Sequence, residues 1–297
     1  MILRVMVSRH AAFYSPLIST LAAGFLDRRG IQATYSVLGA GQRSQTLIRE
    51  GAVDVMQSAV ASNWKPMARG DSPLPVHFAQ INARDGFFLV GRSPSFSWTD
   101  LHGRGLLADH GLQPITMLRY AAHSNEVDWS GVHIVNAGSP EEMAAAFRSG
   151  AGDYVHLQGP AAQQLERDGA GHVVASVGEA MPPVAFSSLC CSREFLGTRE
   201  FRAFLEAFAE AKEWVRTGPA EVIAEREAPF FPGMDTLVLA GTIRRYQALG
   251  CWDGGVEIPR ALYEQALNVF EHAGEIHERF PYESVCVQVQ AGPAADG

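Results

Sequence analysis

The sequence predicts an α/β fold of two lobes, each a mostly parallel sheet flanked by helices, with two hinge crossovers between them. Apolar strand-like runs alternate with amphipathic helical stretches in two successive blocks. This alternation is typical of parallel sheets covered by helices. The motif Arg-x-Gly-Ala-x-Asp occurs once in each block, and 297 residues are enough for two separate cores.

The first block opens with an expected strand at residues 2–8 and a helix at residues 15–29. Ser15 is the expected N-cap, Pro16 the first helical residue and Gly30 the residue that ends the helix. The rest of the block predicts a strand at 31–38, a helix at 42–50, a strand at 53–58, a helix at 59–68, and extended segments at 76–82 and 86–92.

The second block repeats the alternation. It predicts strands at 105–109, 132–136, 153–157 and 172–177, and helices at 114–125, 139–149 and 160–168. An extended segment at 184–192 follows, and the last third is helical, at 200–217, 220–227, 236–249 and 259–272. Residues 291–297 are small and are expected to fray.

The repeated motif supports a duplicated architecture. Residues 49–54 and 148–153 match 99 residues apart, each time between a helix and a strand. Gly51 and Gly150 suit the left-handed residue that ends a helix, and Asp54 and Asp153 are expected at the mouths of their strands.

This organisation predicts lobe one from residues 1–86 plus 189–297, and lobe two from residues 87–188. Two extended segments, 86–91 and 184–191, would form the crossovers. Ligands of open parallel sheets bind beyond the carboxyl ends of the strands, so both lobes are expected to direct those ends at one cleft.

Composition excludes several classes of function. The net charge of −8 argues against a nucleic-acid binder, and no apolar run approaches the roughly 20 residues that cross a bilayer. The four cysteines, Cys190, Cys191, Cys251 and Cys286, show no CxxC spacing and are expected to be free thiols. The apolar run at 16–26 fits a helix better than a secretion signal, so the sequence as it stands predicts a cytoplasmic protein, or a periplasmic one if a signal was removed.

Several segments resemble the SsuA/THI5-like (NMT1-like) group of the periplasmic-binding-protein type 2 superfamily. This group contains sulfonate-, nitrate- and taurine-binding proteins and thiamine-pyrimidine precursor proteins. The similar segments are residues 24–31, 39–42, 50–55, 98–104, 191–196 and 201–208. Their order and spacing are specific for the fold and much less so for the ligand.

The resemblance implies a substrate-binding protein that closes around a small molecule, with an ABC permease as partner if the protein is exported. Two departures stand out. Transport members carry secretion signals, whereas this sequence shows none, and residues 182–188 lack the cysteine-dense run that pyrimidine-synthesising members have just before the return strand. Neither a cofactor nor a resident metal is expected.

Candidate binding residues lie where strands end and helices begin. The loop with Gly39, Gly41 and Gln42 offers backbone N–H groups to an anion, with an ordinary βα turn as the alternative. Ser58 and Gln158 should face each other across the cleft and orient a polar ligand, although Ser58 could also cap a following helix.

Histidines and aromatic side chains complete the candidates. His10, His110 and His156 lie near strand ends and suggest anion donors, with a zinc site as the weaker interpretation. Phe13, Tyr14, Trp64 and Phe186 could enclose a flat ligand or pack in the core. The expected binding set is His10, Phe13, Tyr14, Gly39, Gly41, Gln42, Ser58, Ala59, Asn82, Gly111, Gln113, His156 and Gln158.

The leading hypothesis is a protein that closes by hinge motion around an anionic or heteroaromatic metabolite, such as a sulfonate, a carboxylate or a pyrimidine-like compound. The alternative is a cytosolic enzyme on the same scaffold, of decarboxylase, desulfinase or cofactor-biosynthesis type. Because no GxSxG, HExxH or P-loop motif occurs, no catalytic residue is assigned.

Overall fold

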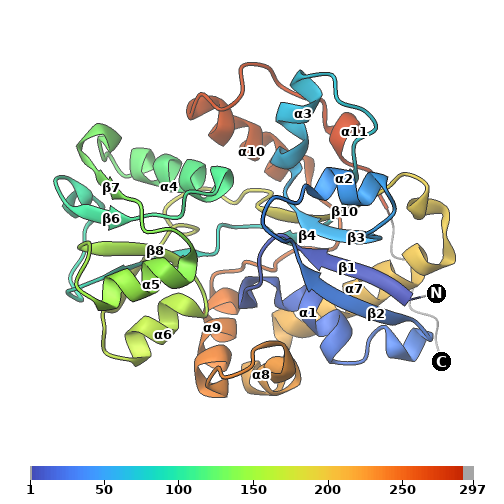
Figure 1. Ribbon diagram of the computed structural model, residues 1–297, viewed down its shortest axis with the longest axis horizontal. Coiled ribbons are helices and arrows are strands. Elements are labelled where there is room, and N and C mark those ends of the chain that lie inside the picture. The colour runs from blue at the N-terminus through green and yellow to red at the C-terminus, as the bar shows by residue number, and fades with distance from the viewer. Residues whose placement is uncertain (1, 290–297) are drawn as a thin grey trace.

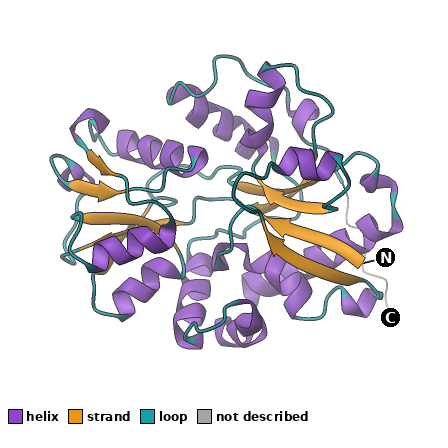
Figure 2. Cartoon of the chain, viewed as in Figure 1, coloured by secondary structure: helices purple, strands orange, loops and turns teal. Residues whose placement is uncertain are grey.

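The computed structural model describes residues 2–289 and consists of two α/β lobes side by side (Figure 1). Each lobe contains a five-stranded sheet with helices packed around it (Figure 2). The strand orders are β2-β1-β3-β10-β4 in lobe one and β7-β6-β8-β5-β9 in lobe two. The predicted two-lobed fold class is therefore confirmed.

Lobe one is built on strands β1 to β4 and β10. Their bounds are Ile2–Val7 (β1), Gln32–Val37 (β2), Val55–Ser58 (β3), Val76–Asn82 (β4) and Ser187–Cys191 (β10). The strand β1 pairs in parallel with β2 and β3, whereas β10 pairs antiparallel with β3 and β4. Three short helices accompany this sheet, α1 (Ser15–Ala22), α2 (Ser44–Arg49) and α3 (Trp64–Ala68).

Lobe two repeats this topology. Its strands are Phe87–Gly91 (β5), Gly105–Leu107 (β6), His133–Val135 (β7), Tyr154–Gln158 (β8) and His172–Ser176 (β9), and its helices are Leu112–Ser124 (α4), Pro140–Arg148 (α5) and Ala161–Arg167 (α6). Here β6 pairs in parallel with β7 and β8, and β5 pairs antiparallel with β8 and β9. In each sheet the antiparallel strand directly follows a crossover from the other lobe, so both predicted crossovers end as strands.

The C-terminal helices connect the two lobes. They are α7 (Arg199–Thr217), α8 (Ala220–Glu227), α9 (Thr236–Ala248), α10 (Arg260–His272) and α11 (Tyr282–Val285). The helices α7 and α8 pack against α1, whereas α9 contacts α6 and α10 contacts α4 of lobe two (Figure 1). No helix among residues 2–289 is long and apolar enough to cross a membrane.

The repeated motif has a structural role at the start of β3 and β8. Gly51 and Gly150 end α2 and α5 with φ of 66° and 95°, the left-handed conformation that favours glycine. The Asp54 carboxylate accepts the backbone N–H of Arg4 at 2.8 Å, and that of Asp153 accepts the backbone N–H of Gly105 at 2.8 Å. Both aspartates therefore tie neighbouring strands together at the end opposite the carboxyl ends of the strands, rather than at the predicted strand mouths.

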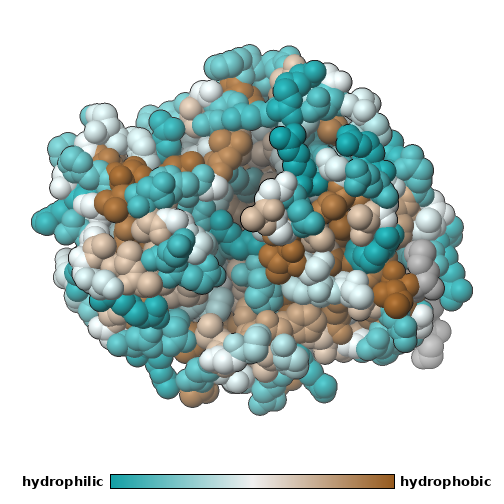
Figure 3. Space-filling view, viewed as in Figure 1, coloured by the Kyte–Doolittle hydropathy of each residue, from teal (hydrophilic) through white to brown (hydrophobic). Residues whose placement is uncertain are grey.

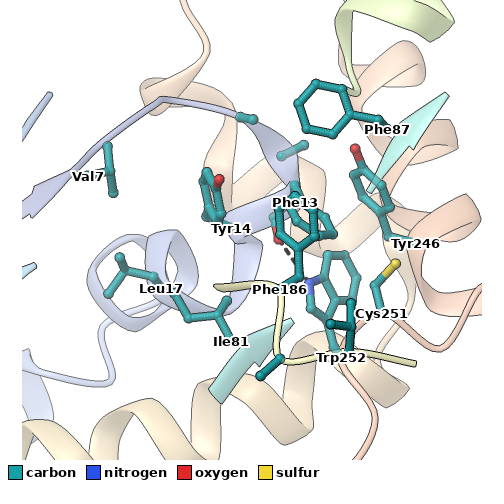
Figure 4. Packing of buried hydrophobic residues seen from close by; sticks show 14 of the residues in the cluster. Val7, Phe13, Tyr14, Leu17, Ile81, Phe87, Phe186, Tyr246, Cys251 and Trp252 are labelled. Atoms are coloured by element: carbon teal, nitrogen blue, oxygen red, sulfur yellow. Dashed lines mark hydrogen bonds between the residues drawn. The ribbon is translucent and has the colours of Figure 1, made fainter. Parts of the chain in front are cut away.

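Buried aromatic residues hold the crossover region together (Figure 4). The Phe13 carbonyl accepts hydrogen bonds from Asn82 Nδ2 at 2.8 Å and from Trp252 Nε1 at 3.0 Å. The Tyr246 hydroxyl donates to the Gly86 carbonyl at 2.9 Å and accepts the Gly159 N–H at 2.8 Å. One side chain of α9 thus joins the outgoing crossover to the end of β8.

We expect Tyr246→Phe to lower the free energy of unfolding by about 1–3 kcal/mol, because it leaves the buried Gly86 and Gly159 backbone groups without a partner. Chemical denaturation measures this loss. The matched control is Tyr120→Phe on α4, whose hydroxyl has only a long contact of 3.4 Å with Gln265 Nε2. Equal losses in both variants would contradict this role of Tyr246.

Two predicted helices differ in the structure. The helix predicted at residues 15–29 ends at Ala22, because Gly24 turns the chain with φ of 75°, and Asp27–Arg29 forms a separate 3-10 turn. Ser15 is the first helical residue rather than the N-cap, and its hydroxyl lies 2.8 Å from a carboxyl oxygen of Glu227.

The helix predicted at residues 59–68 divides into a 3-10 turn, Val60–Asn63, and α3. Ser58 belongs to β3 and does not cap this turn, whose N-cap is Ala59 without a side-chain hydrogen bond. The Ser58 hydroxyl donates to Ser62 Oγ at 3.1 Å. The division of the chain at 86/87 and 188/189 stays a prediction, and its second boundary falls inside β10. The tail predicted to fray lies outside the described residues.

Candidate functional site

A cavity of about 370 Å³ lies between the lobes, at the carboxyl ends of β1, β3 and β8. The space-filling view shows the surface hollowed at this place (Figure 3). We call it the first cavity. Its lining consists of Ser8, Arg9, Tyr14, Gln57, Ser58, Ala59, Ala61, Ser62, Phe87, Leu112, Gln113, Pro114, Gln158, Phe186, Ser187 and Phe270.

The polar groups of the first cavity are mostly neutral hydroxyls and amides. Gln57 Oε1 accepts the backbone N–H and the hydroxyl of Ser8, at 3.0 and 2.7 Å. Gln113, in the first turn of α4, donates its amide to the Phe186 carbonyl and so connects lobe two to the segment before β10. Such groups orient a ligand by hydrogen bonds without demanding that it be charged.

Aromatic rings form much of the wall of this cavity. Tyr14, Phe87, Phe186 and Phe270 line it, and Figure 4 shows the first three around the buried ring of Phe13. Burial raises the pKa of Tyr14, so its hydroxyl stays neutral and can donate a hydrogen bond at physiological pH. Aromatic walls with a few polar groups are typical of sites for flat small molecules.

One ion pair crosses the cleft. Arg9 follows β1 in lobe one, Asp109 follows β6 in lobe two, and Arg9 Nη1 donates to the Asp109 carboxylate. The Asp109 side chain is 4% exposed and that of Arg9 30%. Burial works to raise the pKa of Asp109, but the Arg9 guanidinium outweighs this effect and holds that pKa below its usual range. The pair is therefore charged at neutral pH.

Arg9 lines the cavity and has N–H groups that Asp109 does not use. Of the residues that line the first cavity, all within the described chain, Arg9 is the one cation, and no carboxylate is among them. Asp109 uses only Nη1, while a guanidinium carries five N–H groups. An acid in the cavity can therefore bind Arg9 without displacing Asp109.

His156 lies behind the cavity wall. Its ring stacks on Phe87 with centroids 4.4 Å apart, and neither ring nitrogen has a hydrogen bond among the described residues. Burial lowers the pKa of His156 to about 3, so the ring is neutral at physiological pH. His156 supports Phe87, and the predicted role as a charged donor does not fit this position.

The structure brings five residues of the expected set to the first cavity, namely Tyr14, Ser58, Ala59, Gln113 and Gln158. Phe13 and Asn82 lie behind it in the core, and Gly111 precedes α4, where its N–H donates to Asp109 at 2.8 Å. The loop with Gly39, Gly41 and Gln42 is exposed and lines neither cavity between the lobes; Gln42 Oε1 accepts the Gly39 N–H at 2.7 Å.

His10 reaches a second cavity of about 370 Å³, also between the lobes. Its Nδ1 lies 2.7 Å from the Tyr35 hydroxyl, and its ring centroid lies 4.5 Å from that of Phe231. Burial lowers the pKa of His10, although a contact with the Phe230 backbone works in the opposite direction. The histidine is therefore a neutral group at physiological pH.

The chemistry of a metal or thiol site is not supported. Within residues 2–289, no three His, Cys, Asp or Glu side chains gather where they could hold a metal ion. All four cysteines are free and buried, and burial raises the pKa of Cys190, Cys191 and Cys251. A thiolate nucleophile is disfavoured at such positions.

Sequence reasoning missed Arg9, although a signal was present. Arg9 directly follows the first apolar strand, and Asp109 stands at the corresponding place in the second block. Opposite charges at equivalent strand ends of two facing lobes would have suggested the bridge. Phe87, Gln57 and Phe270 carried no comparable signal, because apolar strands and helices contain many such residues.

The sequence of this chain is similar to those of a known protein family. A model of the NMT1-like family matches residues 38–226, more than half of the chain. The chain belongs to the NMT1-like family. This membership confirms the resemblance seen in the sequence. The binding protein YtlA of Bacillus subtilis strain 168 is 26% identical over 282 residues, which span 93% of this NMT1-like chain and 84% of YtlA.

Solved structures share the fold of this NMT1-like protein. The alkanesulfonate-binding protein SsuA from Xanthomonas axonopodis pv. citri, bound to MOPS, superposes with a TM-score of 0.74 at 14% identity, covering 97% of this chain and 98% of SsuA. The desulfurization enzyme DSZB, solved with biphenyl-2-sulfinic acid, gives a TM-score of 0.68 at 15% identity, covering 97% of each chain. At these identities the likeness shows the fold alone.

Proposed function

We propose that this protein is a solute-binding protein that closes its two lobes around a small planar acid, such as an aromatic or heteroaromatic carboxylate or sulfonate. The observation that carries this proposal is the first cavity, where Arg9 is the one cation among aromatic walls and neutral polar groups. The relatives named as binding proteins support the solute-binding part. An ABC permease as partner stays a prediction.

The charge distribution favours a monoanion over a dianion. Arg9 already shares its charge with Asp109, and the net charge of the whole chain is −8. Attraction of an acid must therefore come from local donors. The N-terminus of the 13-residue helix α4 adds a partial positive charge, because Leu112, Gln113 and Pro114 line the cavity and no side chain caps this helix.

The enzyme alternative has weaker support. DSZB shows that the scaffold occurs in an enzyme. In this chain, however, burial raises the pKa of the Cys190, Cys191 and Cys251 thiols, and the first cavity holds no carboxylate or histidine that could act as a base. No observation on this chain favours a particular reaction.

A ligand panel tests the proposal. We expect an aromatic monocarboxylate or monosulfonate, for example phenylacetate or benzenesulfonate, to raise the melting temperature by about 4 °C at a hundredfold excess over Kd. Uncharged benzamide and the dianion phthalate serve as controls and should shift it less. Stabilisation by benzamide equal to that by the acids would contradict the role of Arg9, and no stabilisation by any panel member would contradict the proposal.

A further inference from the structure

The second cavity adds to the proposed site. It is lined from both lobes and from the segment before α9, by Ala11, Ala144, Ala161, Phe231 and Met234 among others. Its volume of about 370 Å³ equals that of the first cavity. Either cavity alone lies near the lower limit of roughly 300 Å³ for small-molecule sites, whereas the two together lie well inside the usual range.

Arg9 and Gln158 line both cavities, so these two side chains stand between the first cavity and the second. Arg9 comes from lobe one and Gln158 from lobe two. The guanidinium, held from one side by Asp109, is therefore placed between the two spaces. A ligand whose acid group binds Arg9 can therefore extend one part into the first cavity and another part into the second.

The two linings differ in chemistry. Aromatic rings and neutral amides surround the first cavity. Alanine and proline side chains, Met234 and Phe231 make up most of the second lining, which also contains His10 and Gln164. The charged Glu141 and Arg148 of this lining are exposed. Methionine and alanine walls adapt to flexible aliphatic groups rather than selecting a flat ring.

We infer that the ligand is a branched aryl or heteroaryl acid, with its ring in the first cavity, its acid group on Arg9 and an aliphatic arm in the second cavity. This inference rests on the proposed function and names the substrate class of the same site. The acid group stands at the branch point, because Arg9 stands between the cavities. A ligand with only a ring and an acid group would leave the second cavity unfilled.

A series of acids of increasing arm length tests the inference by calorimetric titration of the full chain. The probes are phenylacetate, 2-phenylbutanoate and 2-phenylhexanoate, the last two as separate enantiomers. Each buried carbon should lower Kd about fourfold, so 2-phenylhexanoate, with four more carbons, should bind on the order of two hundredfold more tightly than phenylacetate. One enantiomer should bind more tightly, since the two cavities lie on fixed sides of Arg9.

Variants locate the arm. Ala144 on α5 is buried and lines the second cavity, whereas the next residue, Ala145, is exposed. We expect Ala144→Leu to abolish the gain with arm length while leaving the Kd of phenylacetate unchanged, and the matched control Ala145→Leu to keep the gain. If Ala144→Leu does not fold, Ala161→Leu replaces it in the test. Ala161, at the start of α6, lines the same cavity from a half-buried position, so Ala161→Leu should also abolish the gain with arm length.

The outcomes separate the inference from the proposed function. If phenylacetate binds and longer arms bring no gain, or if Ala144→Leu leaves the gain intact, the second cavity is not part of the site and the inference is overturned while the proposed function stands. Loss of phenylacetate affinity in Ala144→Leu would also overturn it, because the ring would then occupy the second cavity. Failure of every acid to bind the wild type would contradict the proposed function itself.

Discussion

Replacing Arg9 by Gln is expected to lower the free energy of unfolding by about 2–3 kcal/mol and to abolish binding of aromatic acids. The change leaves the Asp109 carboxylate, which is 4% exposed, without its cationic partner. Removing one member of a fully buried ion pair typically costs about 3–5 kcal/mol, and the partial exposure of Arg9 reduces the expected loss to about 2–3 kcal/mol, at or just below the lower end of that range. Chemical denaturation and calorimetric titration with phenylacetate measure the two effects.

A double variant separates stability from binding. Arg9→Gln with Asp109→Asn removes both charges, so most of the lost stability should return, whereas acid binding should not. The matched control is Arg4→Gln at the other end of β1, whose ion pair with Asp54 is largely exposed on the arginine side and should contribute about 1 kcal/mol or less. Binding of phenylacetate by Arg9→Gln with an unchanged Kd would refute the role assigned to Arg9.

A second large effect is expected from pH. Glu227 of α8 is completely buried against α1, with the hydroxyls of Ser15 and Ser19 at 2.8 and 2.6 Å from its carboxyl oxygens. Burial raises the pKa of Glu227 from 4.5 to about 8, because only the hydrogen bonds from Ser19 and Ser15 oppose it and no cation of residues 2–289 is close enough to compensate. Between pH 4.5 and pH 8 the folded chain holds a proton on Glu227 that the unfolded chain has released. The contribution of Glu227 to the free energy of unfolding is therefore complete below pH 4.5, and it is lost as the pH rises from 4.5 through 8.

The variant Glu227→Gln isolates this contribution. The stability advantage of the wild type over the variant should shrink by up to about 1.4 kcal/mol per pH unit between pH 5 and pH 8. Burial also raises the pKa of Asp85 to about 8 and lowers the pKa of Lys212 to about 7 and that of His156 to about 3. Because these three groups are present in both proteins, their titrations cancel in the difference. Glu221→Gln, on the exposed side of α8, is the control and should show no such trend. A difference between wild type and Glu227→Gln that does not change with pH would show that Glu227 is ionised in the folded state.

Much of the fold could be predicted because local signals agree with it. The alternation of apolar strands and amphipathic helices predicts two mostly parallel sheets, and Gly51 and Gly150 determine how α2 and α5 end. The extent of α1 could not be predicted in the same way. Its apolar periodicity continues past Ala22, and only the left-handed turn at Gly24 ends it.

The candidate residues predicted from the sequence reach the first cavity where they end central strands, and lie away from it where the strand proved to be at the edge of its sheet. Ser58 and Gln158 are the last residues of β3 and β8, the central strands of the two sheets, and both line the first cavity. The loop at Gly39 follows β2, which is the edge strand of its sheet, and so lies away from the cavity. Opposite charges at equivalent strand ends made a partnership of Arg9 with Asp109 a possible prediction, but the actual contact depends on how the lobes face each other, which a local sequence pattern does not determine.

A crystal structure with 4-bromophenylacetate, using anomalous scattering of the bromine, tests the central claim most directly. The predicted result is a bromine peak in the first cavity among Phe87, Phe186 and Phe270, with the carboxylate within hydrogen-bond distance of Arg9. A bromine peak at saturating acid only outside the interlobe cleft, or a carboxylate without contact to Arg9, would contradict the claim.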